Sequence, residues 1–188
     1  MVMHMWRTGE GGLQLEGPQW AFALSFYGRP GVAEALLLLQ DRVGADVCLV
    51  LFTLFIARTH RALVDGPDLA VLDAAIADWR REVIWPLRSL RRRLRSGPSP
   101  APAAATQALL QRIKAAEIDA EQIELAVLAQ QFYGRPRAAN PTTGVDVTAI
   151  LERLIAFFAA RCPNSESDTS GEVAAAVKTL VAAMAQFG

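Results

Sequence analysis

The segment LLQRIKAAEIDAEQIELAV, residues 109–127, is the most regular stretch of the chain and decides its fold class. Apolar side chains recur along it at alternating steps of four and three residues, at Leu109, Ile113, Ala116, Ala120, Ile123 and Val127. This spacing places them on one face of an α-helix, in a heptad seam. The seam is shorter than three heptads, so we expect a helical hairpin or bundle rather than a long coiled coil.

Helical spacing also dominates the sequence on either side of this segment. We find no alternation of apolar and polar residues at period two, which a half-buried strand would show. The expected helices cover about residues 18–27, 30–43, 47–62, 71–95, 104–131 and 147–161, followed by a last helix that a Thr169–Glu172 capping box opens. The sequence therefore predicts an all-α protein, a compact bundle of about seven helices.

Proline residues divide the middle of the chain. Pro86 lacks an amide proton and crowds the preceding turn, so it should kink or break the helix over 71–95. The run SGPSPAP, residues 96–102, is the strongest linker signal and predicts a helical hairpin that folds back antiparallel across it. We expect three parts, namely a flexible tail over 1–17, a helical core domain over 18–131, and a C-terminal helical extension over 132–188 that packs on the core.

The pentapeptide FYGRP occurs twice, at residues 26–30 and 132–136, and both copies have the composition of a helix end. Gly28 and Gly134 are suited to stop a helix after an aromatic residue, and Pro30 is suited to open the next helix. The two copies are followed by segments of different length, which argues against duplicated halves. We interpret FYGRP as a helix stop.

A Gly-x-Asp sequence follows each copy and predicts a helix start. Gly44 suits a left-handed helix stop, and Asp46 suits the N-cap of the helix that begins at Val47. Asp146 should cap the helix over 147–161 in the same way. Residues 64–68, VDGPD, are expected to form a turn.

The composition indicates a folded protein without a dominant charge. Hydrophobic residues make up 52% of the 188 residues and charged residues 20%, so some apolar surface is expected to be buried between subunits or against a partner. The formal net charge is +0, so no global field attracts nucleic acid or membrane. The longest apolar run, residues 47–57, is too short for a transmembrane segment. Two separated cysteines and no export signal predict a cytoplasmic location.

Arginines crowd one predicted helix, at positions 80, 81, 88, 91, 92, 93 and 95. They could bind phosphates or an acidic partner, with Arg88, Arg91 and Arg92 as candidate contacts. Alternatively, a hairpin across the linker would pair them with Glu117, Asp119, Glu121 and Glu124. Trp85 beside the kink would cap the core or meet a partner.

Polar residues around the first FYGRP form the best small-ligand candidate. Gln40, Asp41 and Asp46 lie between two apolar helices, and Tyr27 and Arg29 could fold toward them. The alternative is structural, with Asp46 as an N-cap and Asp41 paired with an arginine. No nucleophile elbow, phosphate loop or dinucleotide motif is present. The only two histidines, His4 and His60, lack partners at ligand spacing, so we expect no metal and no cofactor.

Three segments resemble the bacterial domain of unknown function 2390. They are FALSFYGRPGVAEALLLLQDRVGADVCLVLFTLFIA (22–57), WRREVIWPLRSLRRRLR (79–95) and KAAEIDAEQIELAVL (114–128). The signature lies around PGV, LQD and GADV, and the resemblance covers roughly residues 20–130. It implies a cytoplasmic helical protein with no assigned activity, and it leaves the chain from about residue 137 outside the family pattern.

Three functional hypotheses remain open. The leading one is a non-catalytic helical module that self-associates or binds a protein partner, because the chain combines excess apolar residues with a heptad seam and lacks a catalytic set. The second is an accessory or regulatory factor that binds nucleic acid or another polyanion through residues 80–95. The third is an enzyme or small-ligand protein that uses Tyr27, Arg29, Asp41 and Asp46.

Overall fold

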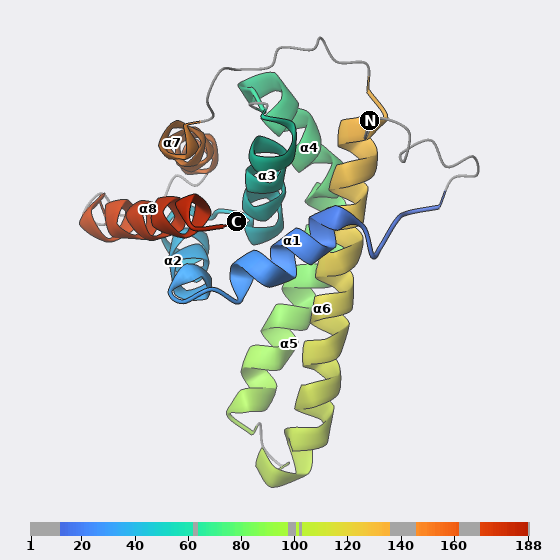
Figure 1. The fold of residues 1–188 in the computed structure, drawn as a ribbon. Helices are drawn as coiled ribbons and strands as arrows, with labels where there is room; N and C mark the ends of the chain where they lie inside the picture. The colour runs from blue at the N-terminus through green and yellow to red at the C-terminus, as the bar shows by residue number, and fades with distance from the viewer. Residues whose placement is uncertain are drawn as a thin grey trace.

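The computed structural model describes residues 12–61, 64–97, 101, 103–135, 146–161 and 170–187. Throughout these residues the regular structure is helical and contains no strand, which confirms the predicted all-α fold (Figure 1). The elements are α1 (Pro18–Tyr27), α2 (Val32–Val43), α3 (Val47–His60), α4 (Gly66–Trp79), the π-helical turn η1 (Arg80–Ile84), α5 (Trp85–Arg95), α6 (Ala103–Tyr133), α7 (Val147–Ala159) and α8 (Ser170–Ala185). Residues 66–95 form one continuous helix, and counted this way the described part has 7 helices.

Helix α3 is the centre of the hydrophobic core. Every residue from Val47 to Ala57 is buried, because this segment is apolar on all sides and is surrounded by α1, α6 and α7. Its one hydroxyl in that run is satisfied locally, since Thr53 Oγ1 donates to the Leu49 carbonyl oxygen at 2.8 Å. A helix of this kind needs neighbours on every side, and this requirement organises the other helices around it.

The predicted aspartate caps are confirmed. Asp46 Oδ1 accepts a hydrogen bond from Leu49 N at 2.8 Å at the start of α3. Asp146 Oδ1 accepts from Thr148 N at 2.9 Å at the start of α7. Gly44 ends α2 with φ 68°, the left-handed conformation expected of it. Gly28 and Gly134 follow the last residues of α1 and α6, as the FYGRP pattern predicts.

Two predicted helix starts are wrong by a few residues. Helix α2 begins at Val32 and not at Pro30, because Gly31 adopts φ 77° and interrupts the helical path. The predicted turn over 64–68 belongs largely to α4, which begins at Gly66. There Asp65 acts as the N-cap, with its Oδ1 accepting from Asp68 N at 2.8 Å.

Pro86 changes the helix type instead of ending the helix. The five residues Arg80–Ile84 before it form a π-helical turn, and α5 continues directly with Pro86 in its first turn. A proline leaves the carbonyl of the preceding turn without its usual donor, and the wider π turn is a known way to accommodate this defect. The sequence predicted that Pro86 would kink or break the helix, and it gave no indication of a π-helical turn.

The buried face of α6 is rotated from the predicted seam. Leu109 is 45% exposed, whereas its neighbour Leu110 is buried. The buried positions that face η1 and α5 recur every seven residues, at Leu110, Glu117 and Glu124. The apolar pattern alone misplaced this face, because two of its central positions carry carboxylates.

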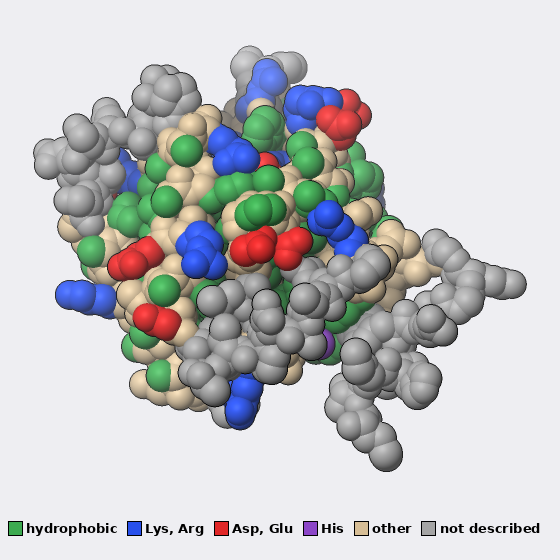
Figure 2. All heavy atoms as spheres, turned by 90° about the horizontal axis from the view of Figure 1, so that it is seen from above, with side chains coloured by type: hydrophobic (Ala, Val, Ile, Leu, Met, Phe, Trp, Pro, Cys, Tyr) green, Lys and Arg blue, Asp and Glu red, His purple; other side chains and the backbone are tan. Residues whose placement is uncertain are grey.

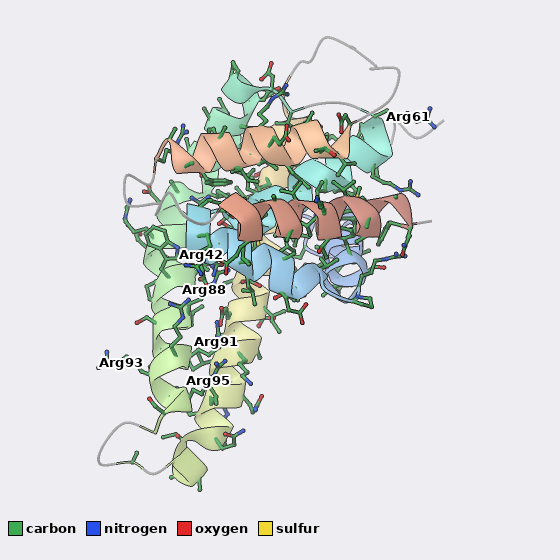
Figure 3. The ribbon with its side chains drawn as sticks, turned by 90° about the vertical axis from the view of Figure 1, so that its left-hand side faces the viewer. Arg42, Arg61, Arg88, Arg91, Arg93 and Arg95 are labelled. Atoms are coloured by element: carbon green, nitrogen blue, oxygen red, sulfur yellow. The ribbon has the colours of Figure 1, made fainter. Side chains whose placement is uncertain are left out.

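Helix α5 and the first part of α6 form a projecting two-helix arm, which we define as residues 85–95 and 103–121. Figures 1 and 3 show it extending away from the other helices. Helix α5 continues directly from η1 and packs extensively against α6. The antiparallel hairpin is thus confirmed for the described residues, while residues 98–100 and 102 of the predicted linker lie outside them.

The last helices cover the side of α2 and α3. Helix α8 packs along α2, and α7 contacts α3, α2 and α8. Phe187 closes the core edge, with its ring centroid 5.1 Å from Phe22 and 5.6 Å from Phe26. Thr169 of the predicted capping box lies outside the described residues, as do residues 1–11 of the predicted tail.

Within the described residues, no single helix is both long enough and apolar enough to cross a bilayer. Helices α1 and α2 would reach the necessary length only together, and they meet at an angle of 98°.

The rotated α6 face predicts unequal effects of two identical substitutions. Leu128 is 0% exposed, so Leu128→Ala should reduce the free energy of unfolding by about 2–5 kcal/mol through lost burial and a cavity. The matched control Leu109→Ala, on the exposed side, should change it by about 0.5 kcal/mol or less. Urea unfolding followed by circular dichroism measures both. Equal losses would mean that Leu109 is as deeply buried as Leu128 and would contradict the observed orientation of α6.

Candidate functional site

A seam of ion pairs runs between the two helices of the arm. Arg88 is central to it, with its side chain 13% exposed. Its Nη2 donates to Glu121 Oε1 at 2.7 Å, and its Nε donates to Glu117 Oε1 at 3.2 Å. Its Nη1 donates to Gln40 Oε1 at 2.6 Å, which ties the C-terminal end of α2 to the arm. One guanidinium therefore joins three helices.

Arg91 extends the seam by binding the same carboxylate, through hydrogen bonds from Nε and Nη2 to the two oxygens of Glu117. Figure 3 shows Arg88 and Arg91 pointing from α5 toward α6. Burial by itself lowers the pKa of Arg88, but the hydrogen bond and charge of Glu121 outweigh it, so the pKa is raised. Arg88 thus stays charged.

A second cluster forms where η1 meets the start of α3. Arg80 Nε lies 2.7 Å from Asp46 Oδ2, and its Nη2 donates to Asp73 Oδ1 at 2.9 Å. Burial opposes the charge of Arg80, yet Asp46 and Asp73 raise its pKa. Asp46 therefore caps α3 with one oxygen and meets a guanidinium with the other. Trp79 fixes the adjacent turn, since its Nε1 donates to the Ala120 carbonyl oxygen at 3.0 Å.

Glu124 is the exception in this cluster. It is 1% exposed, and among the described residues neither of its carboxylate oxygens accepts a hydrogen bond from a nitrogen or hydroxyl donor; the Cys48 thiol is its hydrogen-bonding neighbour. Its nearest cation is Arg80, whose Nε is 3.8 Å from Oε1. Burial raises the pKa of Glu124 well above its usual range, and the charge of Asp46 raises it further. Burial likewise raises the pKa of the neighbouring Cys48 thiol.

A cleft of about 460 Å³ opens beside both clusters, between the C-terminal end of α2 and the outer side of η1 and α5. Its lining includes four arginines, Arg80, Arg88, Arg92 and Arg93, together with Trp85, Ser89, Gln40, Asp41 and Asp46. Trp85 is 54% exposed. Within the described part of the chain, no ion pair or side-chain hydrogen bond joins the guanidinium groups of Arg92, Arg93 and Arg95 to other residues. Arg93 points away from α6 (Figure 3).

The structure brings together some of the predicted site residues and separates others. Gln40 and Asp46 line the same cleft as Arg88. The charges of Glu121 and Arg88 act on the pKa of the Tyr27 hydroxyl. Burial is the main cause that raises the pKa of Tyr27, followed by the charge of Glu121.

Two predicted residues lie apart from this network. The Arg29 guanidinium stacks on Phe187, with its Cζ 4.8 Å from the ring centroid. Asp41 is exposed at the rim of the cleft. The proposed group of Tyr27, Arg29, Asp41 and Asp46 is therefore not gathered around one pocket.

Sequence reasoning missed Arg80, Asp73, Cys48 and the inward position of Glu124 as members of one cluster. The available signal was the seven-residue spacing of Leu110, Glu117 and Glu124, which places two carboxylates on the buried face of α6. Such positions require positive partners, and the facing helix is rich in arginine.

Removing Arg88 should destabilise the protein. Arg88→Ala leaves Glu121 and Gln40 without their bonds to this guanidinium, and loss of one partner of a buried ion pair costs about 3–5 kcal/mol. Arg92→Ala, on the same helix, removes no observed ion pair and should cost about 0.5 kcal/mol or less. Urea unfolding of both variants tests this. A small effect of Arg88→Ala would show that the seam contributes little to stability.

Glu124 predicts a dependence of stability on pH. Its folded-state pKa is raised above the ordinary value of 4.5, so its contribution to stability is complete below that pH and is lost as the pH rises. A glutamine side chain does not titrate, so the Glu124→Gln variant does not lose stability in this way. The variant should therefore gain stability relative to the wild type as the pH rises above 4.5, by at most about 1.4 kcal/mol per pH unit.

The measurement is urea unfolding of both proteins between about pH 5 and pH 8, with a chelator present. Glu82→Gln, an exposed change in the same protein, serves as the control. A difference between Glu124→Gln and the wild type that stays constant with pH, or that reverses, would contradict a raised pKa.

Comparison with known proteins gives one match. Residues 18–128 match the family described as protein of unknown function (DUF2390). No curated protein and no solved structure matches the chain. The bacterial origin and cytoplasmic location implied by the resemblance remain predictions. Because the match extends from α1 almost to the end of α6, over more than half of the chain, this protein belongs to the DUF2390 family.

Proposed function

We propose that this protein is a non-catalytic binding module whose arm docks an acidic segment of a partner protein. The observation that carries the proposal is the outer face of α5, where Trp85, Arg92 and Arg93 line one side of the cleft. Trp85 is more than half exposed, and the guanidinium groups are without a carboxylate partner in the described structure.

The charge pattern favours an acidic occupant. Helix α5 contains no acidic residue, and the carboxylates of Glu117 and Glu121 are already engaged by Arg88 and Arg91. A partner that supplies carboxylates for Arg92 and Arg93 would form charge-assisted, bidentate hydrogen bonds. An apolar side chain of the same partner could pack on Trp85. Aromatic and arginine side chains are the residues that contribute most often to binding energy at interfaces.

The arm also exposes apolar area. Four large hydrophobic side chains on it are more than a third exposed, namely Trp85, Leu90, Leu109 and Ile118. Exposed apolar groups on a projecting two-helix element are typical of an interaction surface. By contrast, Figure 2 shows hydrophobic, basic and acidic side chains interspersed on the upper face, with no continuous field of one sign.

The same geometry makes nucleic acid a weaker candidate. Of the seven arginines between 80 and 95, four (Arg80, Arg81, Arg88 and Arg91) are engaged by carboxylates of the protein itself. The remaining Arg92, Arg93 and Arg95 supply less positive charge than the full set of seven arginines that the sequence suggested. Affinity for a duplex depends on the number of phosphates neutralised, so three arginines give weak binding.

Fluorescence anisotropy with defined probes tests the proposal. The probes are a labelled peptide of glutamate residues with interspersed leucines, its lysine counterpart, and a labelled DNA duplex. We expect the acidic peptide to bind best, with an affinity that falls as salt rises. The double variant Arg92→Glu/Arg93→Glu should weaken it at least tenfold, and Trp85→Ala severalfold. Arg81→Glu, a charge reversal elsewhere on the same continuous helix, should leave it unchanged.

Other results would replace the proposal. Stronger binding of DNA, lost in the double variant, would assign the arm to nucleic acid. A concentration-dependent dimer in light scattering that Trp85→Ala abolishes would make a second copy of the chain the occupant. Equal binding of the acidic peptide by the wild type and the double variant would exclude this face of α5.

A further inference from the structure

Three potential metal ligands meet beneath the cleft. A carboxylate oxygen of Asp46, the Sγ atom of Cys48 and a carboxylate oxygen of Glu124 all lie within 4.8 Å of one another, and all three residues are buried. Asp46 and Cys48 come from the N-cap and first turn of α3, and Glu124 comes from α6. The packing of α3 against α6 therefore creates the group.

Glu124 supplies an independent indication of a ligand. Its carboxylate is 1% exposed, and among the described residues neither oxygen accepts a hydrogen bond from a nitrogen or hydroxyl donor, which leaves the Cys48 thiol as its hydrogen-bonding neighbour. A buried carboxylate with so few partners is costly, because the Cys48 thiol and Arg80, whose Nε is 3.8 Å away, replace only part of the water that solvated it. A coordinated cation would satisfy these oxygens and their charge together.

We infer that Asp46, Cys48 and Glu124 bind a divalent transition-metal ion, with Zn²⁺ the best match to this donor set. Zinc accepts thiolate and carboxylate ligands together. Calcium and magnesium prefer oxygen ligands alone, and a cysteine among three donors disfavours them. The site contains no histidine, so the positions of His4 and His60 in the sequence give no sign of it.

The charges around the site are compatible with a divalent cation. Ionised Asp46, Cys48 and Glu124 carry three negative charges, which Zn²⁺ and the adjacent Arg80 would balance. Arg80 lies 2.7 Å from Asp46 Oδ2 and would hold that carboxylate from outside the coordination shell, as outer groups commonly do at metal sites. Asp73, which binds Arg80, lies also within 3.9 Å of Arg161, so its own charge is shared by two cations.

The cleft provides an entry path, because Asp46 and Arg80 belong both to its lining and to the buried cluster. Three protein ligands are fewer than the four of structural zinc sites, so one coordination position would remain for water or a small ligand. The metal site would be a specific ligand site within the binding module, and it includes none of Trp85, Arg92 and Arg93.

Cobalt binding tests the site, because Co²⁺ substitutes for Zn²⁺ and is coloured. The experiment uses the 188-residue chain with Cys162→Ser, in which Cys48 is the only cysteine, after treatment with a chelator. We expect one equivalent of Co²⁺ to bind with a thiolate-to-cobalt charge-transfer band. Zn²⁺ should abolish the band and, at about a hundredfold excess over its Kd, should raise the Tm by roughly 5–10 °C.

Two near-isosteric variants and one control complete the test. In the Cys162→Ser background, Cys48→Ser should lose the charge-transfer band, and Glu124→Gln should weaken Co²⁺ binding at least tenfold. Asp119→Asn, an exposed change on the same helix, should bind like the parent. Circular dichroism verifies that each variant is folded.

X-ray absorption of the zinc-loaded parent protein gives a readout that does not depend on the variants. We expect one sulfur ligand at about 2.3 Å and oxygen ligands at about 2.0 Å. A first shell without sulfur, a charge-transfer band that survives Cys48→Ser, or folded parent protein with neither a band nor a Tm shift would overturn the inference.

Discussion

The burial of arginine against glutamate between helix 66–95 and α6 is the constraint on which the rest of the structure depends. A guanidinium removed from water is tolerable only where carboxylates meet it in good geometry. Arg88 with Glu121 and Arg91 with Glu117 satisfy this condition in a single antiparallel register. Sliding either helix by one residue would separate these pairs and bury their charges alone. The seam therefore fixes the hairpin, and through Gln40 it also fixes the position of α2.

One continuous helix thus carries arginines with two different environments. Those facing α6 are paired with its carboxylates, whereas Arg92 and Arg93, which line the cleft with Trp85, have no carboxylate partner among the described residues. The rigid inner side positions the outer side, since the backbone of α5 is anchored by Arg88 and Arg91. This division explains how a chain with a net charge of +0 can present a local basic surface.

Local signals in the sequence were sufficient for the fold and insufficient for the site. Asp46, Asp146 and Gly44 each act on neighbouring residues, so their roles followed from the sequence alone. The hairpin followed from the linker and from the opposite charges of its two helices. The cluster around Glu124 was not predicted, because it depends on the rotation of α6 about its axis, and the apolar spacing indicated a different rotation from the seven-residue spacing of Leu110, Glu117 and Glu124. Apolar spacing determines that rotation only when the buried positions are apolar, and Glu117 and Glu124 are not.

The π-helical turn at Arg80–Ile84 has a geometric consequence for this arrangement. Each residue of a π turn advances by roughly 80° around the axis, compared with roughly 100° in an α-helix. Over the eight residues that separate Arg80 from Arg88, the wider turn brings the two side chains almost into line, whereas an uninterrupted α-helix would leave them roughly 80° apart. The turn thus has the effect of one inserted residue. It sets the angle around the helix axis between Arg80, in the cluster at the start of α3, and Arg88, in the ion-pair seam of the arm. Deleting one residue there would leave the arm paired and would turn Arg80 away from Asp46 and Glu124.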